Sequence, residues 1–374
     1  MTIIAHLRPY SVPTLLGDLL VSAGSRPAKE IDIPASRNIN ERIFLPSNYY
    51  VAGLRQKLVL LNAKLAIAWS GDFMQAVDFF STVDPLRHLN DIDPQQVQSV
   101  IDGIDEYRKN KINLIAMVGT SGNCTLICHR ISPPQDFGTI SSVACAGSGS
   151  QEFLEILKQH AENIEPLNAG IRIDELASGF DLNLISALSG EEFVSTLPLQ
   201  RGWGGGFEIV RLLGGEIQRV RNQLFLNFFV EHQGDEGALW WVPNFRHLDY
   251  WQNLTVIQAI EHEVDSSGSF MRGRNDVFIV GPPSSESVDM STFSRPGIDQ
   301  HDAVLTYILL GDRRDSASAV TYAAAYAKPV FRYHVSGALM NVSFDRMFID
   351  NLIDGLGNML QKKIVFRGAR NRPE

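Results

Sequence analysis

The order in which paired strand-like segments and helix-like segments alternate most constrains how this chain can fold. Apolar, β-branched segments come in pairs around short turns, as in residues 58–69 around Asn62 and residues 112–131 around a Gly-Asn turn. Two helix-like segments follow the first strands, and two more follow the second set before a last hairpin. We therefore expect an α+β chain with two stacked antiparallel sheets and helices on both outer faces, a four-layer αββα order.

The helix-like segments carry apolar residues at helical spacing and start signals of their own. Residues 72–83 repeat large apolar residues on one helical face. Asp93 stands directly before Pro94, a pair typical of a helix start. Further helices are predicted after Gly149 and over residues 182–193.

The N-terminus combines a hydroxyl with a carboxylate. Thr2 follows the initiator Met1, and Asp18 lies sixteen positions further on. Removal of Met1 would leave a free α-amine on the residue that carries the hydroxyl. One residue would then supply both a nucleophile and its base, which is the layout of an N-terminal nucleophile.

A lysine and a glycine follow at the spacing of a known family. Lys57 precedes an apolar run that contains Asn62 and ends at Gly71. Together with Thr2 and Asp18, these residues resemble the proteasome β-subunits and the bacterial HslV peptidase, a family of N-terminal nucleophile (Ntn) hydrolases. In that family a lysine is followed by Asn or Asp five places on and by a small-Gly turn fourteen places on, as here.

Two later blocks resemble the same family in the same order. Residues 137–161 look like its strand, Gly-Ser-Gly-Ser run and helix, with Ser150 at the position of the serine beside the N-terminal threonine. Residues 202–220 look like its glycine-rich turn and final hairpin. The resemblance covers about residues 2–225 and implies the family's αββα Ntn-hydrolase sandwich.

The resemblance implies a catalytic role for five residues. Thr2 Oγ1 would attack a carbonyl while the Thr2 α-amine, with an ordinary pKa of about 7.7 to 8.0, accepts its proton. The Lys57 ammonium would favour negative charge on the hydroxyl, and Asp18 would orient that lysine. The Gly71 N–H would stabilise the oxyanion, and Ser150 would hydrogen-bond the terminal amine.

The resemblance also implies a substrate pocket. Trp69, two residues before Gly71, stands where the family lines its first specificity pocket, and Val21 and Phe73 would share that wall. A large ring at Trp69 would narrow the pocket and favour a small side chain in the substrate. A tryptophan of the hydrophobic core is the alternative interpretation.

These residues together predict a threonine peptidase of the proteasome or HslV type. Its subunits would form a homo-oligomeric ring that encloses the site, admits unfolded polypeptides or peptides, and is served by a separate ATPase unfoldase. No cofactor or metal is expected. Two alternatives stay open: a proteasome-like scaffold without catalysis, and an Ntn amidohydrolase that acts on a small amide, because a fold does not fix a substrate.

Several residues leave these alternatives open. Taken singly, Asp18 suits a loop, Lys57 a solvated strand and Ser150 a helix start. The stretch LQRGWGGG lacks the Asp and second Ser that many active proteasome subunits carry before their Gly-Gly, although HslV-type members lack them too. Residues 23–50 form an insertion between the aspartate and the lysine. Catalysis also requires that Met1 is removed.

Charge and cysteine content limit the classes of binding partner and the cell compartment that we expect. A formal net charge of −9 argues against an extended nucleic-acid interface, because phosphate binding needs a surplus of Lys and Arg. An odd number of cysteines, Cys124, Cys128 and Cys145, makes a poor disulfide framework. No apolar run is long enough to span a membrane. We expect a cytoplasmic protein that binds neither nucleic acid nor membrane.

The chain continues well beyond the resemblance. We predict a proteasome-like domain over residues 1–229 and an α+β extension of unknown role over residues 230–374. Within the extension, residues 256–263 suit a helix or a strand, and an alanine-rich helix is expected near residues 316–327. A last amphipathic helix is expected around residues 344–360.

Overall fold

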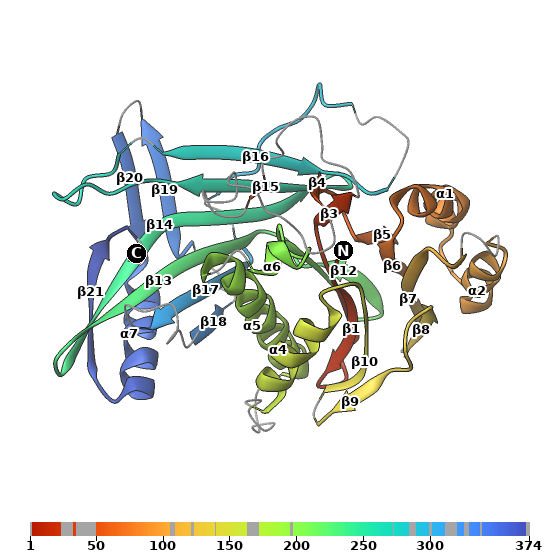
Figure 1. Cartoon of the computed structure of the whole chain (residues 1–374), viewed down its shortest axis with the longest axis horizontal. Helices are drawn as coiled ribbons and strands as arrows, with labels where there is room; N and C mark the ends of the chain where they lie inside the picture. The colour runs from red at the N-terminus through yellow and green to blue at the C-terminus, as the bar shows by residue number, and fades with distance from the viewer. Residues whose placement is uncertain are drawn as a thin grey trace.

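The structure is a computed structural model that places most of the chain in two sheet-based parts (Figure 1). Met1 and nearly all of the predicted insertion lie outside the described residues. The described residues are 2–23, 33–34, 50–104, 109–120, 123–138, 140–162, 172–194, 197–271, 273–283, 289–298, 301–310, 320–324, 329–336 and 339–371.

The first part contains two antiparallel sheets. The six-stranded sheet has the order β12-β11-β2-β1-β10-β9, and the four-stranded sheet has the order β5-β6-β7-β8. The strands of the larger sheet are β1 (Ile4–Pro9), β2 (Thr14–Asp18), β9 (Gln135–Phe137), β10 (Ile140–Ala146), β11 (Phe207–Leu213) and β12 (Glu216–Arg219). Those of the smaller sheet are β5 (Leu58–Asn62), β6 (Leu65–Gly71), β7 (Ile112–Thr120) and β8 (Asn123–His129).

The two sheets pack face to face, and helices cover their outer faces. Ile4 and Val210 of the larger sheet meet Ala66 and Ile115 of the smaller one in a shared apolar layer. Period-two alternation turns the other face of each strand outward, where it packs against helices. Helices α1 (Phe73–Val83) and α2 (Pro94–Asp102) cover the smaller sheet, and α4 (Ser150–Glu162) and α5 (Ile173–Val194) cover the larger one. The predicted α+β class is confirmed.

Local signals explain where several elements begin and end. Asp72 caps α1 by accepting a hydrogen bond from the Gln75 N–H, and Asp93 caps α2 with a full capping box. The apolar run TLLGDLLVS, residues 14–22, forms two strands. β2 ends at Asp18, and β3 (Leu20–Ala23) leaves the larger sheet and pairs with β4 (Tyr50–Leu54).

The second part is built around a seven-stranded mixed sheet. Six of its strands have the order β16-β15-β14-β13-β17-β18, and the seventh, β21, pairs with β14. The predicted boundary at residue 229 falls inside β13. The strands are β13 (Gln223–Gln233), β14 (Glu236–Trp251), β15 (Leu254–Glu261), β16 (Arg274–Val280), β17 (Ala303–Leu310), β18 (Val320–Ala324) and β21 (Lys363–Ala369). A hairpin of β19 (Phe331–Ser336) and β20 (Leu339–Phe344) and the helix α7 (Arg346–Leu360) complete this part.

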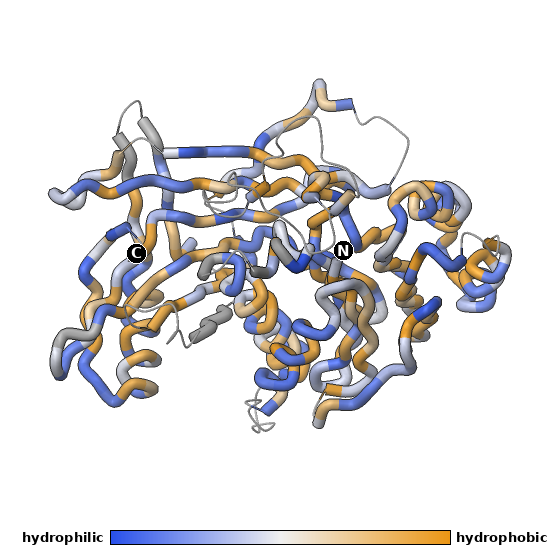
Figure 2. Tube along the Cα trace, viewed as in Figure 1, coloured by the Kyte–Doolittle hydropathy of each residue, from blue (hydrophilic) through white to orange (hydrophobic). Residues whose placement is uncertain are grey.

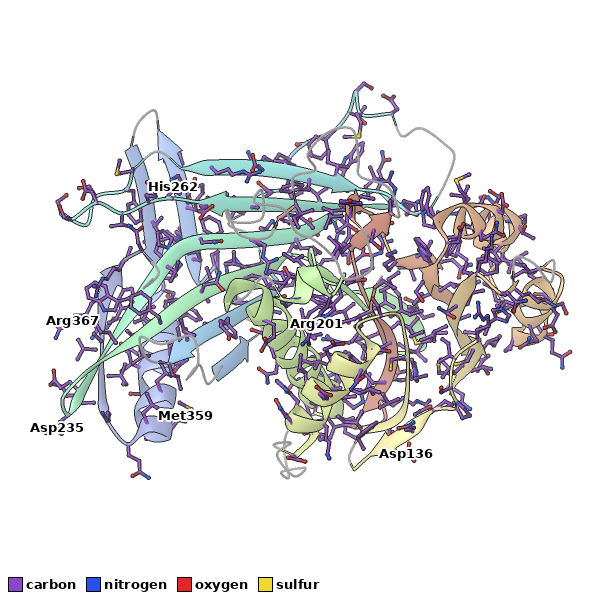
Figure 3. All side chains as sticks on the ribbon, in the orientation of Figure 1. Asp136, Arg201, Asp235, His262, Met359 and Arg367 are labelled. Carbon is purple, nitrogen blue, oxygen red and sulfur yellow. The ribbon has the colours of Figure 1, made fainter. Side chains whose placement is uncertain are left out.

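An aromatic core holds the second part together. Trp241 and Phe245 of β14 pack against Phe331 and Phe344 of the β19-β20 hairpin and against Phe348 of α7. In Figure 2 hydrophobic and hydrophilic residues alternate along the long strands of this sheet. Charged side chains such as Asp235 and Arg367 stand at its periphery (Figure 3).

Two expectations for this part can be compared with the structure. The last predicted helix is confirmed as α7. The alanine-rich helix near residues 316–327 is wrong where it can be checked, because residues 320–324 form β18. Antiparallel pairing with β17 outweighs the helix propensity of alanine there. Among the helices of the described residues, none is long and apolar enough to cross a membrane.

Candidate active site

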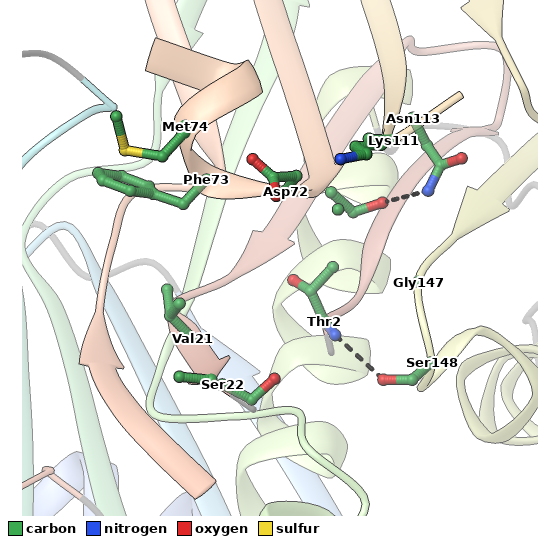
Figure 4. A pocket seen from close by; sticks show the side chains of 13 residues that line it. Thr2, Val21, Ser22, Asp72, Phe73, Met74, Lys111, Asn113, Gly147 and Ser148 are labelled. Atoms are coloured by element: carbon green, nitrogen blue, oxygen red, sulfur yellow. Dashed lines mark hydrogen bonds between the residues drawn. The ribbon is translucent and has the colours of Figure 1, made fainter. Parts of the chain in front are cut away.

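Thr2 lies just before β1, at the bottom of a cavity (Figure 4). Its side-chain hydroxyl donates a hydrogen bond to Asp18 Oδ1. Its backbone nitrogen donates to Ser148 Oγ over 3.1 Å, and its carbonyl oxygen accepts from the Gly149 N–H over 3.2 Å. The residue is 2% exposed. Both atoms that an N-terminal nucleophile would use therefore have defined partners.

Asp18 ends β2 and is fully buried. Besides the Thr2 hydroxyl, its carboxylate accepts the Ile3 N–H over 3.1 Å and the Gly204 N–H over 2.9 Å. Burial raises the pKa of the Asp18 carboxyl, and attraction to the Lys57 ammonium together with these hydrogen bonds works against that rise. The carboxylate is thus fixed in one orientation beneath Thr2.

Lys57 directly precedes β5 and is buried as well, with 2% exposure. Its Nζ lies 4.1 Å from the centre of the Trp69 ring, a cation–π contact. Burial lowers the pKa of the Lys57 ammonium, while attraction to Asp18 raises it. The segment at Lys57 passes close to Gly17, where a side-chain carbon would stand 3.1 Å from Lys57 Cβ. Glycine at position 17 leaves room for this approach. The lysine and the aspartate form a charged pair shielded from water.

The cavity above Thr2 has a volume of about 870 Å³. One wall is strand β3, the opposite wall is the end of β6 with the start of α1, and β7 and the turn before α4 close the remaining sides. Its lining residues are Thr2, Val21, Ser22, Ala23, Ser70, Gly71, Asp72, Phe73, Met74, Lys111, Asn113, Gly147 and Ser148.

Most of the residues predicted for the site come together. Asp18 interacts with both Thr2 and Lys57, although the insertion separates it from the lysine in sequence. Val21, Gly71 and Phe73 line the cavity. Gly71 has φ +111°, and a side-chain carbon there would stand 2.2 Å from the Lys111 carbonyl oxygen, so this position requires glycine.

Two predicted residues lie elsewhere. Trp69 is fully buried in the core between the smaller sheet and α1, where its Nε1 donates to the Gln56 carbonyl over 2.8 Å. Its ring supports Lys57 from below and is outside the cavity lining. Ser150 is the first residue of α4, and its N–H donates to the Gly147 carbonyl over 3.3 Å. The serine hydroxyl that contacts the Thr2 nitrogen belongs to Ser148.

Two glycines complete the site in ways that the sequence did not indicate. Gly147 has φ +105°, and a side-chain carbon there would stand 1.9 Å from the Thr2 carbonyl oxygen. Gly204, in the glycine-rich turn, directs its N–H at Asp18 and has φ +118°. Glycine-dense stretches around both residues were the available signal, because several adjacent glycines favour left-handed backbone and close approach.

The described residues offer no metal centre and no reactive thiol in the cavity. Among them, no group of three or more His, Cys, Asp or Glu side chains is placed to hold a metal ion. The three cysteines are half-buried free thiols, and burial raises the pKa of Cys145 to about 11.

Comparisons with known proteins give a distant likeness. No protein-family model matches the sequence, and no curated protein matches it. Solved structures that resemble the chain include the crystal structure of eukaryotic HslV from Trypanosoma brucei, with a TM-score of 0.32 and 12% sequence identity. That match covers 56% of this chain and 98% of the other. A likeness this remote carries no argument, so the function rests on the site itself.

Proposed function

We propose that this protein is a threonine peptidase of the proteasome-like Ntn-hydrolase class, with Thr2 as nucleophile once Met1 has been removed. The observation that carries the proposal is the position of Thr2. Its hydroxyl and its nitrogen are held by Asp18 and Ser148 at the bottom of a cavity of about 870 Å³, with Lys57 buried beside the same aspartate. Those are the groups that a nucleophile with its own amine requires.

In the proposed reaction Thr2 Oγ1 attacks a peptide carbonyl carbon. The free α-amine accepts the hydroxyl proton and later passes it to the leaving amine, so that the bond to nitrogen breaks and an ester with Thr2 remains. Water, activated by the same amine, then hydrolyses the ester. Ser148 Oγ accepts a hydrogen bond from this nitrogen and so keeps it beside the hydroxyl.

Lys57 and Asp18 would supply the electrostatics of the attack. A buried ammonium beside Thr2 favours negative charge on Oγ1 and disfavours a proton on the amine. Asp18 holds its orientation through the Ile3 and Gly204 N–H groups and keeps the lysine charged by attraction. The backbone at Gly71, in the cavity wall near Thr2, is the proposed donor to the oxyanion.

The substrate class and the assembly belong to the same proposal. The cavity lies between β3 and the end of β6, which suits a peptide in extended conformation that forms main-chain hydrogen bonds to strand backbones. A homo-oligomeric ring that encloses the cavity, fed with unfolded polypeptide by a separate ATPase, would restrict such a site to suitable substrates.

The proposal is tested with chains that begin at residue 2, released by cleavage of an N-terminal fusion. Thr2→Ala removes the nucleophile, and hydrolysis of fluorogenic peptides should fall by about a thousandfold or more. Thr2→Ser keeps a hydroxyl and should retain measurable turnover. Thr120→Ala, at the far end of β7 from the cavity, is the matched control and should behave as the wild type. Hydrolysis rates that stay at the background level in both Thr2→Ala and the wild type would favour the scaffold alternative.

A further inference from the structure

One buried threonine of the second part forms hydrogen bonds with side chains that lie next to the Lys57 segment. Thr255, on β15, is fully buried and sits between two side chains of the first part. Gln56 Nε2 donates to Thr255 Oγ1 over 2.6 Å, and Thr255 Oγ1 donates in turn to Glu208 Oε1. The hydroxyl therefore uses both its acceptor and its donor capacity.

The two partners of Thr255 flank Lys57. Gln56 precedes the lysine, and the N–H of Leu58, which follows it, acts on the Glu208 carboxylate and lowers its pKa. Hydrogen bonds run in one direction from Gln56 through Thr255 to Glu208, so that Thr255 joins the residue before Lys57 to the carboxylate that Leu58 faces.

Further contacts fix the same segment to the second part. The Gln56 N–H donates to the Gly281 carbonyl over 3.0 Å, and Gln56 Nε2 also donates to the Asn253 carbonyl over 2.8 Å. Glu208 and Gln56 are 1% and 0% exposed, so water does not compete for these bonds. Buried hydrogen bonds of this kind fix a backbone in one position more firmly than exposed ones.

We propose that Thr255 is a positioning residue for Lys57: by joining Gln56 to Glu208, it fixes the backbone on both sides of the lysine and so the place of its ammonium beside Asp18. The inference rests on the proposed function for its catalytic consequence only. The C-terminal sheet is then a part of the active-site support, in addition to packing on α5.

The test uses three single variants of the full chain beginning at Thr2. Thr255→Val keeps the shape and removes the hydroxyl, and Thr255→Ser keeps the hydroxyl. Thr306→Val is the matched control, because Thr306 is another fully buried threonine of the same sheet, on β17, and its Oγ1 has no hydrogen-bond partner among the residues that the structure describes. Gln56→Met, which removes the amide, is the second variant if Thr255→Val does not fold.

Two readouts separate positioning from a general loss of structure. The first is the pH titration of the Lys57 ammonium by NMR of lysines labelled at the ε-carbon, assigned with Lys57→Arg. Asp18 and Arg55 are the charged groups that act on this ammonium, and neither is changed by the variants. The second readout is the split between kcat and KM in peptide hydrolysis.

Thr255→Val should move the Lys57 titration midpoint by at least about half a unit and lower kcat about tenfold, with KM within about twofold of wild type. Thr255→Ser should restore both, and Thr306→Val should change neither. An unchanged titration in Thr255→Val, or an equal change in Thr306→Val, overturns the inference. If the wild type does not hydrolyse peptides, the proposed function fails, whereas the titration still decides whether Thr255 positions Lys57.

Discussion

The first part of the chain and the C-terminal sheet bury different kinds of side chain. The two-sheet body buries Asp18, Lys57 and Glu208, each at most 2% exposed. The core of the C-terminal sheet and α7 is built from aliphatic and aromatic residues around Trp241 and Phe245, and the buried Asp249 of β14, 7% exposed, lies outside this apolar cluster. Burying charge costs free energy even when it is paired, whereas burying aromatic surface is favourable.

This contrast indicates a division of labour. In the proposed function, the buried charges near Thr2 set the electrostatic environment of the reaction, as is common at functional sites. In the same proposal, the C-terminal sheet fixes the segment that carries Lys57 through Thr255. Changes near Thr2 should therefore lower the kcat of the folded protein, whereas changes in the C-terminal core should lower stability with little effect on kcat.

The largest effect on stability is expected from Trp241→Ala. Trp241 is 1% exposed and packs against several aromatic rings of the C-terminal core. Its loss should lower the free energy of unfolding by about 3–5 kcal/mol, measured by denaturant unfolding. The kcat of the folded fraction should stay within about threefold of wild type. A large fall in kcat without loss of stability would contradict the difference between the C-terminal core and the two-sheet body.

Lys57→Met should impair chemistry in the protein that still folds. The variant removes the ammonium that acts on Asp18 but fills a similar volume, so the kcat of peptide hydrolysis by the folded fraction should fall about 10²- to 10³-fold. It also leaves Asp18 buried without its counter-charge, so the free energy of unfolding should fall by about 3–5 kcal/mol. Lys64→Met, on the turn after Asn62, is the control and should keep full activity; its Nζ donates to the Gly215 carbonyl over 2.6 Å, so the control also loses a lysine contact.

Gly147→Ala tests the close approach beneath Thr2. The new methyl group would stand 1.9 Å from the Thr2 carbonyl oxygen, so the nucleophile must move. Hydrolysis should fall about 100-fold, because a misplacement of about 1 Å can have that effect. Gly214→Ala is matched in left-handed backbone, with φ +60°, but has no atom within 4 Å of the new carbon. It should carry only a backbone cost of about 1 kcal/mol and retain activity.

The last effect concerns the pH dependence of stability. Burial lowers the pKa of His6, on β1, from 6.5 to about 4, and its Nδ1 donates to the Ser142 carbonyl. The unfolded chain therefore takes up a proton between pH 6.5 and 4 that the folded chain does not. The free energy of unfolding should fall by roughly 3 kcal/mol as the pH drops through this window. His6→Gln should reduce that slope, and His88→Gln, at an exposed position, should leave it unchanged.

The sequence predicted what depends on spacing and order. Thr2, Asp18 and Lys57 are assigned together because their order resembles that of the proteasome and HslV family, and the pairing of β1 with β2 brings Thr2 and Asp18 to the same end of the larger sheet. The insertion between Asp18 and Lys57 did not prevent this, because loop length has little influence on how paired strands meet.

The sequence could not predict what depends on local backbone. In the run Gly147 to Ser150 either serine could face Thr2, and the left-handed Gly147 selects Ser148. Trp69 and Gly71 share a strand face by period-two alternation, but the cavity begins only where β6 ends, so the tryptophan stays in the core. Nothing in the sequence indicates a role for Thr255, because its hydrogen bond with Gln56 joins residues 199 positions apart.

The central claim is that Thr2 is a nucleophile with a free α-amine. The most direct measurement is the intact mass and N-terminal peptide map of the purified protein after incubation with a peptide boronate, whose boron bonds to a nucleophilic hydroxyl. We predict a chain that begins at Thr2 and carries the boronate there, with no adduct in Thr2→Ala. A folded protein that retains Met1, or one that begins at Thr2 and stays unmodified, would contradict the account.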